Sequence, residues 1–317
     1  SKAAFKDKRS WDAFDIGPEH SQQGAAFDGR YLYFPPGFQG DPRTESDQSS
    51  SAIRYDTKAP FRDTSSYSSF DMAAVLGSGA ACFDGGAFDG QYIYFVPLEN
   101  PLVVRYDTGR PYEDPESWQS FDGRSVGMGR CVGSVFDGRH MYFAAYGHSM
   151  LVRYDTTREF VSANSWESHD AAKTGGLDTN GFDGGFFDGR FVYFVPFVNL
   201  PGGLTRRLGG QPILHSNYLR YDPTKPFNEP FSWKSYDASS VDDMCSIGYN
   251  GGAFDGRYFY AAPWVRSTER VPGRPSVHGT ILRYDTTGAN VTFSLRYADY
   301  GHNGGLCASV PGPSFHI

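Results

Sequence analysis

The sequence predicts an all-β protein, a β-propeller made of four-stranded antiparallel blades, on three observations. The tetrapeptide FDGR or a near copy of it occurs five times, and each copy is followed by an aromatic, β-branched run. A tripeptide RYD follows each run after a loop of variable length. The 317 residues include 26 Phe, 21 Tyr and 38 Gly, which favours short strands between tight turns over helices.

The repeat predicts four strands in each unit. Asp-Gly between two apolar segments is a strong hairpin signal, because Gly accepts a positive φ and Asp tolerates it. Strand a therefore precedes FDG, strand b follows it, strand c ends in RYD, and strand d begins at the next aromatic residue. Apolar residues at consecutive positions indicate sheets that are buried on both faces, as in radially repeated blades. The FDG copies begin at Phe27, Phe88, Phe136, Phe187 and Phe254, the RYD copies at Arg54, Arg105, Arg153, Arg220 and Arg283, and the d strands at Tyr67, Trp118, Trp166, Trp233 and Phe293.

The two ends of the chain predict a sixth blade in a single domain of residues 1–317. Residues 1–15 contain Trp11 and the pair Phe14–Asp15, as a d strand would, with no a or b strand before them. Residues 302–317 resemble an a–b hairpin around Pro311–Gly312. The two halves complete each other, and such closure removes open sheet edges. Five blades with two stray terminal strands is the alternative.

The repeat resembles the Kelch repeat over nearly the whole chain. In blade 2, AFDGQYIYFVP, VVRYDT and SW follow the Kelch order of an Asp-Gly turn, an apolar strand, a YD strand and a Trp. The departure is that the Gly pairs, such as Gly85–Gly86, precede FDG and do not follow strand b. The resemblance implies a propeller, but Kelch propellers include enzymes and interaction modules, so it implies no single function.

Residues present in every blade are expected to be structural. We expect the FDG aspartates to hold turns, the RYD residues to form ion pairs and turn hydrogen bonds, and Trp11, Trp118, Trp166 and Trp233 to fill one core position. Trp264 lies outside this pattern, in a long loop after strand b of blade 5. An exposed loop Trp is a candidate for substrate binding.

The b–c loops predict one asymmetric pocket at the mouth of the propeller channel. They are long in blades 1, 4 and 5 and short in blades 2 and 3, whereas a site in every blade would need equal loops. Histidine can serve as an acid, base or metal ligand near neutral pH, and arginine can bind an anionic group. The catalytic candidates are His20, His148, His215, His302 and Arg130, and the substrate-binding candidates are Trp264, Arg206, Arg207 and His278.

A recurrent oxygen-bearing side chain predicts a metal ion on the propeller axis. Four residues before the FDG phenylalanine, at the start of the innermost strand, stand Gln23, Asp84, Val132, Asp183 and Asn250, with Asn303 as the sixth-blade equivalent. Gly pairs behind them would permit close approach of the strands. Carboxylate and amide oxygens suit a hard cation such as Ca²⁺. A transition metal becomes the better choice if His20 or His302 joins them. The alternative is that these side chains cap the turn before a Gly-rich strand.

Composition narrows the function without choosing it. The net charge of −7 argues against a nucleic-acid partner, and no apolar run is long enough to span a membrane, so we expect a soluble protein. No signal peptide is visible, four cysteines lack CxxC spacing, and compartment and oligomeric state stay open. We expect an enzyme acting on a small molecule or saccharide, a hydrolase, lyase or isomerase aided by the metal. The alternative is a non-catalytic module that binds a glycan or protein.

Overall fold

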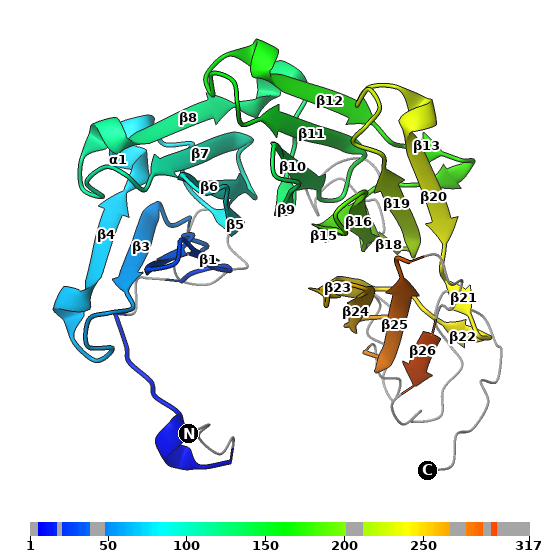
Figure 1. The fold of residues 1–317 in the computed structure, drawn as a ribbon, viewed down its shortest axis with the longest axis horizontal. Helices are drawn as coiled ribbons and strands as arrows, with labels where there is room; N and C mark the ends of the chain where they lie inside the picture. Colours follow the sequence, from blue (N-terminus) through cyan, green and yellow to red (C-terminus); the bar gives the residue numbers. More distant parts are fainter. Residues whose placement is uncertain are drawn as a thin grey trace. The chain divides into compact units, whose positions relative to one another are not determined.

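The structure is a computed structural model that describes residues 6–17, 21–38, 48–200, 212–266, 277–287 and 293–296. Over these residues the chain forms five four-stranded antiparallel sheets, which match the five complete repeats and are called blades 1 to 5 (Figure 1). Within each blade the strands follow the order a, b, c, d. The predicted all-β class and strand order are therefore confirmed for five blades.

The strand bounds agree closely with the repeat. Blade 1 contains β1 (Ala26–Phe27), β2 (Tyr31–Phe34), β3 (Ser51–Asp56) and β4 (Tyr67–Asp71). Blade 2 contains β5 (Phe83–Phe88), β6 (Tyr92–Pro97), β7 (Leu102–Asp107) and β8 (Trp118–Asp122). Blade 3 contains β9 (Cys131–Phe136), β10 (His140–Ala145), β11 (Met150–Asp155) and β12 (Trp166–Asp170). Blade 4 contains β15 (Phe182–Phe187), β16 (Val192–Pro196), β19 (Asn217–Tyr221) and β20 (Trp233–Asp237). Blade 5 contains β23 (Tyr249–Phe254), β24 (Tyr258–Pro263), β25 (Thr280–Asp285) and β26 (Phe293–Arg296).

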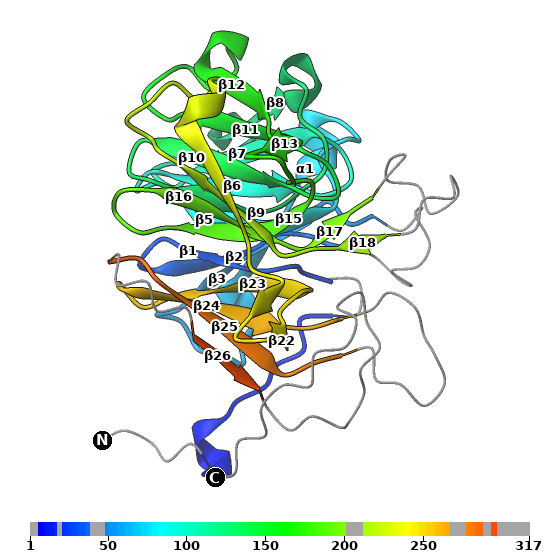
Figure 2. The same cartoon turned by 90° about the vertical axis from the view of Figure 1, so that its right-hand side faces the viewer.

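Short hairpins and helical turns connect these strands. The hairpin β17 (Val198–Asn199) and β18 (Ile213–Leu214) projects from one end of blade 4 (Figure 2). Two further hairpins link strand d to the next blade, β13 (Lys173–Thr174) with β14 (Leu177–Asp178), and β21 (Ser240–Val241) with β22 (Met244–Cys245). The helical turns are α1 (Met72–Leu76), η1 (Lys8–Ser10), η2 (Thr64–Ser66), η3 (Pro115–Ser117), η4 (Gly123–Val126), η5 (Ala163–Ser165) and η7 (Pro230–Ser232). None of the helices in the described segments is long and apolar enough to cross a membrane.

The chain divides into two compact units. One consists of Ser1–Phe95 and Val104–Ser120, and the other of Val96–Val103 and Phe121–Ile317. In the first unit, the inner strands β1 and β5 contact each other. In the second unit, β15 lies between β9 and β23 and contacts both, so the inner strands of blades 3, 4 and 5 are neighbours.

The FDG aspartates hold the a–b turns, as expected. Asp137 accepts backbone N–H bonds from Arg139 (2.8 Å) and His140 (2.7 Å) through Oδ1, and Tyr142 donates its hydroxyl to Oδ2 (2.6 Å). The same three bonds recur at Asp28, Asp89, Asp188 and Asp255. Burial alone would raise the pKa of Asp137, but interaction with the His140 ring and the hydrogen bonds from the two backbone N–H groups and Tyr142 hold it at about 2.

The RYD residues form the predicted ion pairs. Arg139, which follows the FDG glycine, pairs with Asp155 of RYD (2.7 Å), and Asp155 also accepts hydrogen bonds from Thr157. Equivalent pairs join Arg30 to Asp56 and Arg257 to Asp285. These contacts tie strand c to the a–b turn of its own blade.

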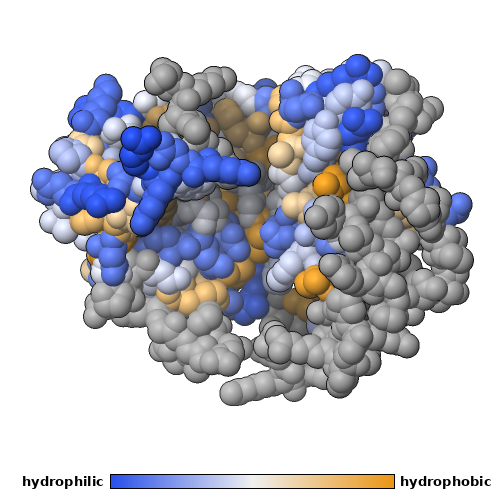
Figure 3. Space-filling model, turned by 90° about the horizontal axis from the view of Figure 1, so that it is seen from below, coloured by the Kyte–Doolittle hydropathy of each residue, from blue (hydrophilic) through white to orange (hydrophobic). Residues whose placement is uncertain are grey.

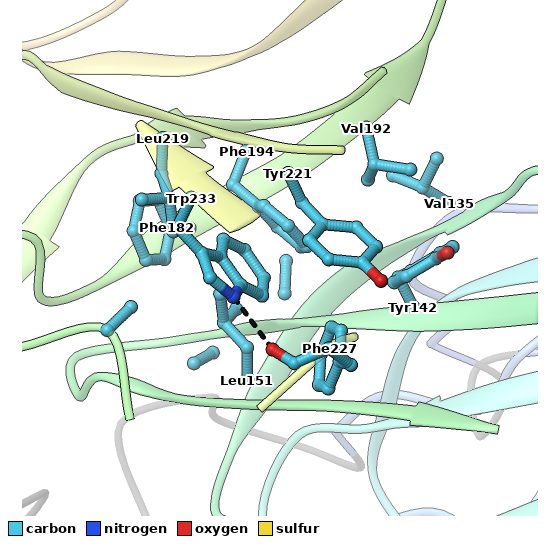
Figure 4. Close-up of a cluster of buried hydrophobic side chains, with 13 residues drawn as sticks. Val135, Tyr142, Leu151, Phe182, Val192, Phe194, Leu219, Tyr221, Phe227 and Trp233 are labelled. Atoms are coloured by element: carbon cyan, nitrogen blue, oxygen red, sulfur yellow. Dashed lines mark hydrogen bonds between the residues drawn. The ribbon is translucent and has the colours of Figure 1, made fainter. Parts of the chain in front are cut away.

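An aromatic slot at the first residue of strand d supplies much of the core. In blade 4, Trp233 donates its Nε1–H to the carbonyl oxygen of Phe227 (2.8 Å), beside Tyr221 (Figure 4). His169 of blade 3 stacks flat on Trp233, with ring centroids 4.6 Å apart. Trp233 is only 4% exposed. Stacks of the same kind join Phe70 to Trp118 and Phe121 to Trp166, while in blade 1 Tyr67 takes the slot and Phe14 stacks on it.

The predicted role of the glycines before FDG is confirmed where inner strands meet. Gly133 has a φ of +72°, and a Cβ on it would lie 2.9 Å from Gly184 Cα on the neighbouring inner strand. The same separation holds between a Cβ on Gly24 and Gly85 Cα in the first unit. Only glycine combines this backbone conformation with such a close approach.

The expected burial of Trp11 is wrong for the described residues. Trp11 is 61% exposed, and residues 11–17 form no strand. The predicted partner segment, residues 302–317, lies outside the described residues, so the sixth blade stays a prediction.

On the face shown in Figure 3, hydrophilic residues cover most of the coloured surface and hydrophobic residues show between them. Isolated exposed apolar residues are ordinary in globular proteins.

Candidate functional site

Three of the predicted site histidines occupy one repeated position. His148, His215 and His278 each precede strand c by two residues. In each, Nδ1 accepts the backbone N–H two residues later, at distances of 3.2 to 3.3 Å. The other ring nitrogen, Nε2, contacts a carbonyl oxygen at the start of an inner strand: Arg130 (2.8 Å), Gly181 (2.9 Å) and Gly248 (3.4 Å) respectively.

These bonds define a structural role for the three histidines. A carbonyl oxygen can only accept, so Nε2 carries the proton and the neutral ring has both nitrogens engaged. Burial lowers the pKa of all three, to about 4 for His278. Constant spacing is the signal that sequence reasoning missed: each histidine stands five residues before an RYD arginine, where blades 1 and 2 have Ser49 and Asn100. The other two candidates, His20 and His302, lie outside the described residues.

Arg130 is not available as an unpaired anion-binding group. Its guanidinium forms an ion pair with Glu99, and both side chains are mostly buried. A ligand carboxylate would therefore compete with Glu99 for Arg130. Arg206 and Arg207, in the long b–c loop of blade 4, lie outside the described residues.

Trp264 is accessible, as the sequence predicted. It is 46% exposed and stacks on Phe197 with ring centroids 5.2 Å apart. Trp118, Trp166 and Trp233 are each 4% exposed, so Trp264 differs from the tryptophans of the aromatic slot. Its role in substrate binding stays a prediction, because the long loops of the predicted channel-mouth pocket lie largely outside the described residues.

Two of the oxygen-bearing side chains of the predicted metal site, those of Asp183 and Asn250, contact each other. Asn250 donates its Nδ2–H to Asp183 Oδ2 (3.0 Å) across neighbouring inner strands of the second unit. Asp84, in the first unit, has its pKa raised by burial, and Gln23 Oε1 there is buried with no hydrogen-bond partner among the described residues.

These oxygens do not complete a metal site in the described segments. No group of three or more His, Cys, Asp or Glu residues that could hold a metal ion occurs there. Asn250 turns its N–H, not its oxygen, toward Asp183, which fits a hydrogen bond better than a shared ion. Asn303 lies outside the described residues, so the Ca²⁺ site stays a prediction.

A cavity that the sequence analysis did not anticipate lies between blades 4 and 5 in the second unit. Its volume of about 430 Å³ falls within the range of ordinary small-molecule sites. The lining residues belong to the strands of blades 4 and 5, except Ala238, which lies just after strand d of blade 4. The lining consists of Phe186, Tyr193, Tyr218, Leu219, Arg220, Lys234, Ser235, Tyr236, Ala238, Phe259, Leu282, Tyr284 and Asp285.

The cavity coincides with a departure of blade 5 from the repeat. Strand d begins eleven residues after the RYD aspartate in blades 1 to 4, but eight residues after Asp285 in blade 5. Five residues after that aspartate, blades 1 to 4 have Phe61, Tyr112, Phe160 and Phe227, and blade 5 has Asn290. Register changes too: Tyr221 pairs with Trp233 in blade 4, whereas Arg283 and not Tyr284 pairs with Phe293 in blade 5.

Tyr236, on strand d of blade 4, also lies at this cavity. It occupies the position of Phe70, Phe121 and His169, each of which stacks on the slot aromatic of the next blade. Tyr236 instead is 58% exposed and lines the cavity. The spacing and the Asn290 substitution were visible in the sequence and are the signal that could have located this cavity.

Charge at the cavity edge also departs from the repeat. The RYD arginine faces an acceptor in blades 1 to 3, and bonds Ser68 Oγ, Gln119 Oε1 and Glu167 Oε2 respectively. In blade 4, Arg220 is paired directly with Lys234 across the strands. Arg220 lies over the Phe191 ring (4.2 Å), and neither cation has an ion-pair partner among the described residues. Asp285, also at the cavity, is neutralised by Arg257 (2.8 Å), which lowers its pKa.

Comparisons with known proteins identify the fold alone. No family model matches the chain, and no curated protein matches it. Hydrazine synthase of Kuenenia stuttgartiensis is similar at 12% identity and a TM-score of 0.54, over 91% of this chain and 69% of that one. The Pan2 WD40 domain of Neurospora crassa is similar at 11% identity and a TM-score of 0.53, over 89% and 69%. Virginiamycin B lyase from Staphylococcus aureus is similar at 8% identity and a TM-score of 0.50, over 88% and 70%.

These similarities cover enzymes and a WD40 domain, and they do not single out the Kelch family. At 8 to 12% identity they carry no activity across to this chain. Together with the five four-stranded antiparallel blades, they show that the chain has the β-propeller fold.

Proposed function

We propose that this chain is a β-propeller that binds a small organic ligand in the cavity between blades 4 and 5. One observation carries the proposal. At this interface the described residues line a cavity of about 430 Å³, and Tyr236, which stands at the sequence position of Phe70, Phe121 and His169, is one of them. A lining made mostly of aromatic and aliphatic residues, with a few polar groups, is typical of ligand sites.

The chemistry of the lining favours binding over catalysis. Among the described residues that line the cavity there is neither a histidine nor a cysteine. Ser235 donates its hydroxyl to the carbonyl oxygen of Thr174 (2.6 Å), and Tyr193 donates its hydroxyl to Asp188 (2.9 Å). No nucleophile and base are therefore paired among these lining residues. The enzyme expected at the channel mouth stays an alternative, and its remaining candidates, His20, His302, Arg206 and Arg207, lie outside the described residues.

Indole tests the proposal, because it is the side-chain ring that fills the slot of blades 2 to 4. We expect indole to bind the full chain by isothermal titration or saturation-transfer NMR. Tyr236→Ala removes the stacking ring from an exposed position and should weaken binding about two- to tenfold, since an aromatic pair contributes about 0.5–1.5 kcal/mol.

The matched control is Phe231→Ala, which removes another exposed aromatic ring outside the cavity lining. It should leave indole binding unchanged. Absence of indole binding to the wild-type chain, or an equal loss in both variants, would overturn the proposal.

A further inference from the structure

We infer that the ligand of the blade 4–5 cavity is a small aromatic carboxylate, whose ring stacks on Tyr236 and whose anion lies between Arg220 and Lys234. This inference rests on the proposed function and adds the chemical class of the ligand. Two departures from the repeat support this inference. One is the pairing of two cations, Arg220 and Lys234, and the other is the position of the Tyr236 ring at the cavity.

The charge argument starts from a conflict within blade 4. Residues directly opposite on antiparallel strands have Cβ atoms about 4.5–5.5 Å apart, and like charges there are destabilising. Arg220 and Lys234 are such a pair. In blade 3, the corresponding Arg153 donates to Glu167 Oε2 (2.7 Å). Blade 4 thus has a lysine where its neighbour has a carboxylate, and a bound anion would supply the missing acceptor.

The surroundings of the two cations favour an anion over a second cation. Among the described lining residues Asp285 is the one carboxylate, and Arg257 and Thr287 already engage it. The other polar groups there are hydroxyls: those of Ser235 and Tyr193 donate to Thr174 and Asp188, and Tyr218 has a buried hydroxyl with no partner in the described part of the chain. Arginine offers planar paired donors that match a carboxylate, with lysine as a second point charge.

The ring argument uses the geometry of the intact slots. Phe70, Phe121 and His169 stack on the next blade's tryptophan with ring centroids 4.4, 4.1 and 4.6 Å apart. Tyr236 stands at their position and lines the cavity. Also in the lining, Phe186 and Phe259 stack on each other at 4.2 Å across the two blades. A planar ring in the cavity would repeat the stack that blades 2 to 4 make with tryptophan.

The cation Lys234 and the ring of Tyr236, on which the two arguments depend, belong to the same strand, β20. Lys234 and Tyr236 are two residues apart on β20, so their side chains lie on the same face of the sheet. A ligand with its ring on Tyr236 therefore has its anionic group one or two bonds away, near Lys234 and Arg220. Arylacetates have this shape.

The test compares three ligands that share one ring: neutral indole, the anion indole-3-acetate and the cation tryptamine. Calorimetric titration of the full chain should give indole-3-acetate a dissociation constant about tenfold below that of indole, as a charge-assisted hydrogen bond provides. Tryptamine should bind more weakly than indole. Added salt should reduce the differences in affinity among the three ligands, because Arg220 and Lys234 are partly exposed and salt screens their charges.

Lys234→Glu isolates the charge, because it restores the pairing seen in blade 3. We expect the preference for indole-3-acetate over indole, measured within this variant, to disappear or reverse. Lys58→Glu is the matched control, since it makes the same charge change at an exposed lysine outside the cavity lining. It should keep the preference.

Two results would overturn the inference. One is equal affinity for the three ligands in the wild type, and the other is loss of the preference in Lys58→Glu as well, which would mean a net-charge effect. Either result leaves indole binding intact, and with it the proposed function. If none of the three ligands binds, the proposed function fails together with the inference.

Discussion

His148, His215 and His278 show how a residue with catalytic potential can be structural. Each ring joins the N–H at the start of strand c to a carbonyl at the start of an inner strand. The alternatives at this position, Ser49 and Asn100, are also short polar residues, and the Ser49 hydroxyl accepts the N–H of Ser51 (3.4 Å). The histidine ring and the Ser49 hydroxyl are thus two acceptors for that N–H, whereas at Asn100 the backbone carbonyl oxygen accepts the N–H of Leu102 (2.7 Å).

The first prediction concerns acid stability at this position. Burial holds the pKa of His278 at about 4, below the ordinary value near 6.5. The unfolded chain therefore binds the proton more readily, and the stabilisation is present above about pH 6.5 and is lost as pH falls toward about 4. We expect His278→Asn to remove part of this loss, on the order of 1–3 kcal/mol in the free energy of unfolding.

The measurement is urea unfolding at pH 7.5 and pH 5. The difference between the two free energies should be smaller in His278→Asn than in the wild type. Ser49→Asn changes the equivalent position of blade 1 without removing a titrating group, so it should keep the wild-type difference. An unchanged difference in His278→Asn would mean that this histidine does not control acid stability.

At the scale of elements, the aromatic slot couples each d strand to its neighbour. The residue three positions after the start of strand d stacks on the slot of the next blade, as Phe121 does on Trp166 and His169 on Trp233. A histidine in this series shows that the slot selects a flat ring and not an apolar one. Tyr236 is the member of the series at the cavity.

The second prediction separates two reasons for glycine within blade 3. Gly138, in the FDG turn, has a φ of +96°, and nothing lies within 4 Å of the place that an added Cβ would take, so only the backbone conformation demands glycine. Gly133 has a φ of +72° and also lies against Gly184. We expect Gly138→Ala to lower the free energy of unfolding by about 1–2 kcal/mol, and Gly133→Ala to lower it by more.

Thermal and urea unfolding of the two variants check this order. Because both changes are Gly→Ala in one blade, effects on the unfolded chain are matched. Equal losses would show that the neighbouring inner strand moves aside readily and that close packing at Gly184 contributes little.

The repeat predicted the strands because their signals are local. Asp-Gly fixes the a–b turn and RYD ends strand c, and the structure places both as expected from Phe27 to Asp285. The sequence signal for the cavity is what blade 5 lacks. Asn290 stands where the other blades have an aromatic residue, and the spacing between Asp285 and Phe293 is three residues shorter than in blades 1 to 4. A repeat is recognised from the residues that its blades share. A site where one blade departs from the repeat is found only when the blades are compared position by position.

At the scale of the whole molecule, the predicted pocket and metal required contacts that no repeat encodes. The side chain of Asp183 is engaged by Asn250, and Arg130 is engaged by Glu99, which is contributed by the b–c loop of another blade. Pairings of this kind depend on how loops and neighbouring blades meet, and loop sequence varies from blade to blade. The fold follows from the repeat, whereas the site follows from exceptions to it.

The last prediction concerns residues 11–15, which the sequence assigns to the d strand of a sixth blade. Phe14 stands three residues after Trp11 and stacks on Tyr67 with ring centroids 5.5 Å apart. Phe70, three residues after Tyr67, stacks on Trp118 in the same way. Phe14 thus occupies the position in the first unit that a d strand of a preceding blade would give it, and it does so although residues 11–17 form no strand in the structure.

If this segment closes the propeller, Phe14→Ala should lower the free energy of unfolding by about 1–3 kcal/mol, since it deletes a partly buried ring from a stack. Phe231→Ala, at a ring that is 63% exposed, should change it by less than about 0.5 kcal/mol. Hydrogen exchange supplies a second measurement, which separates strand pairing from simple loss of ring packing. The amides of residues 11–15 should be protected in the wild type, because a paired d strand buries its N–H groups in a ladder, and Phe14→Ala should release them. Unprotected amides in the wild type would mean that Phe14 packs on blade 1 as an isolated ring and that these residues do not belong to a sixth blade.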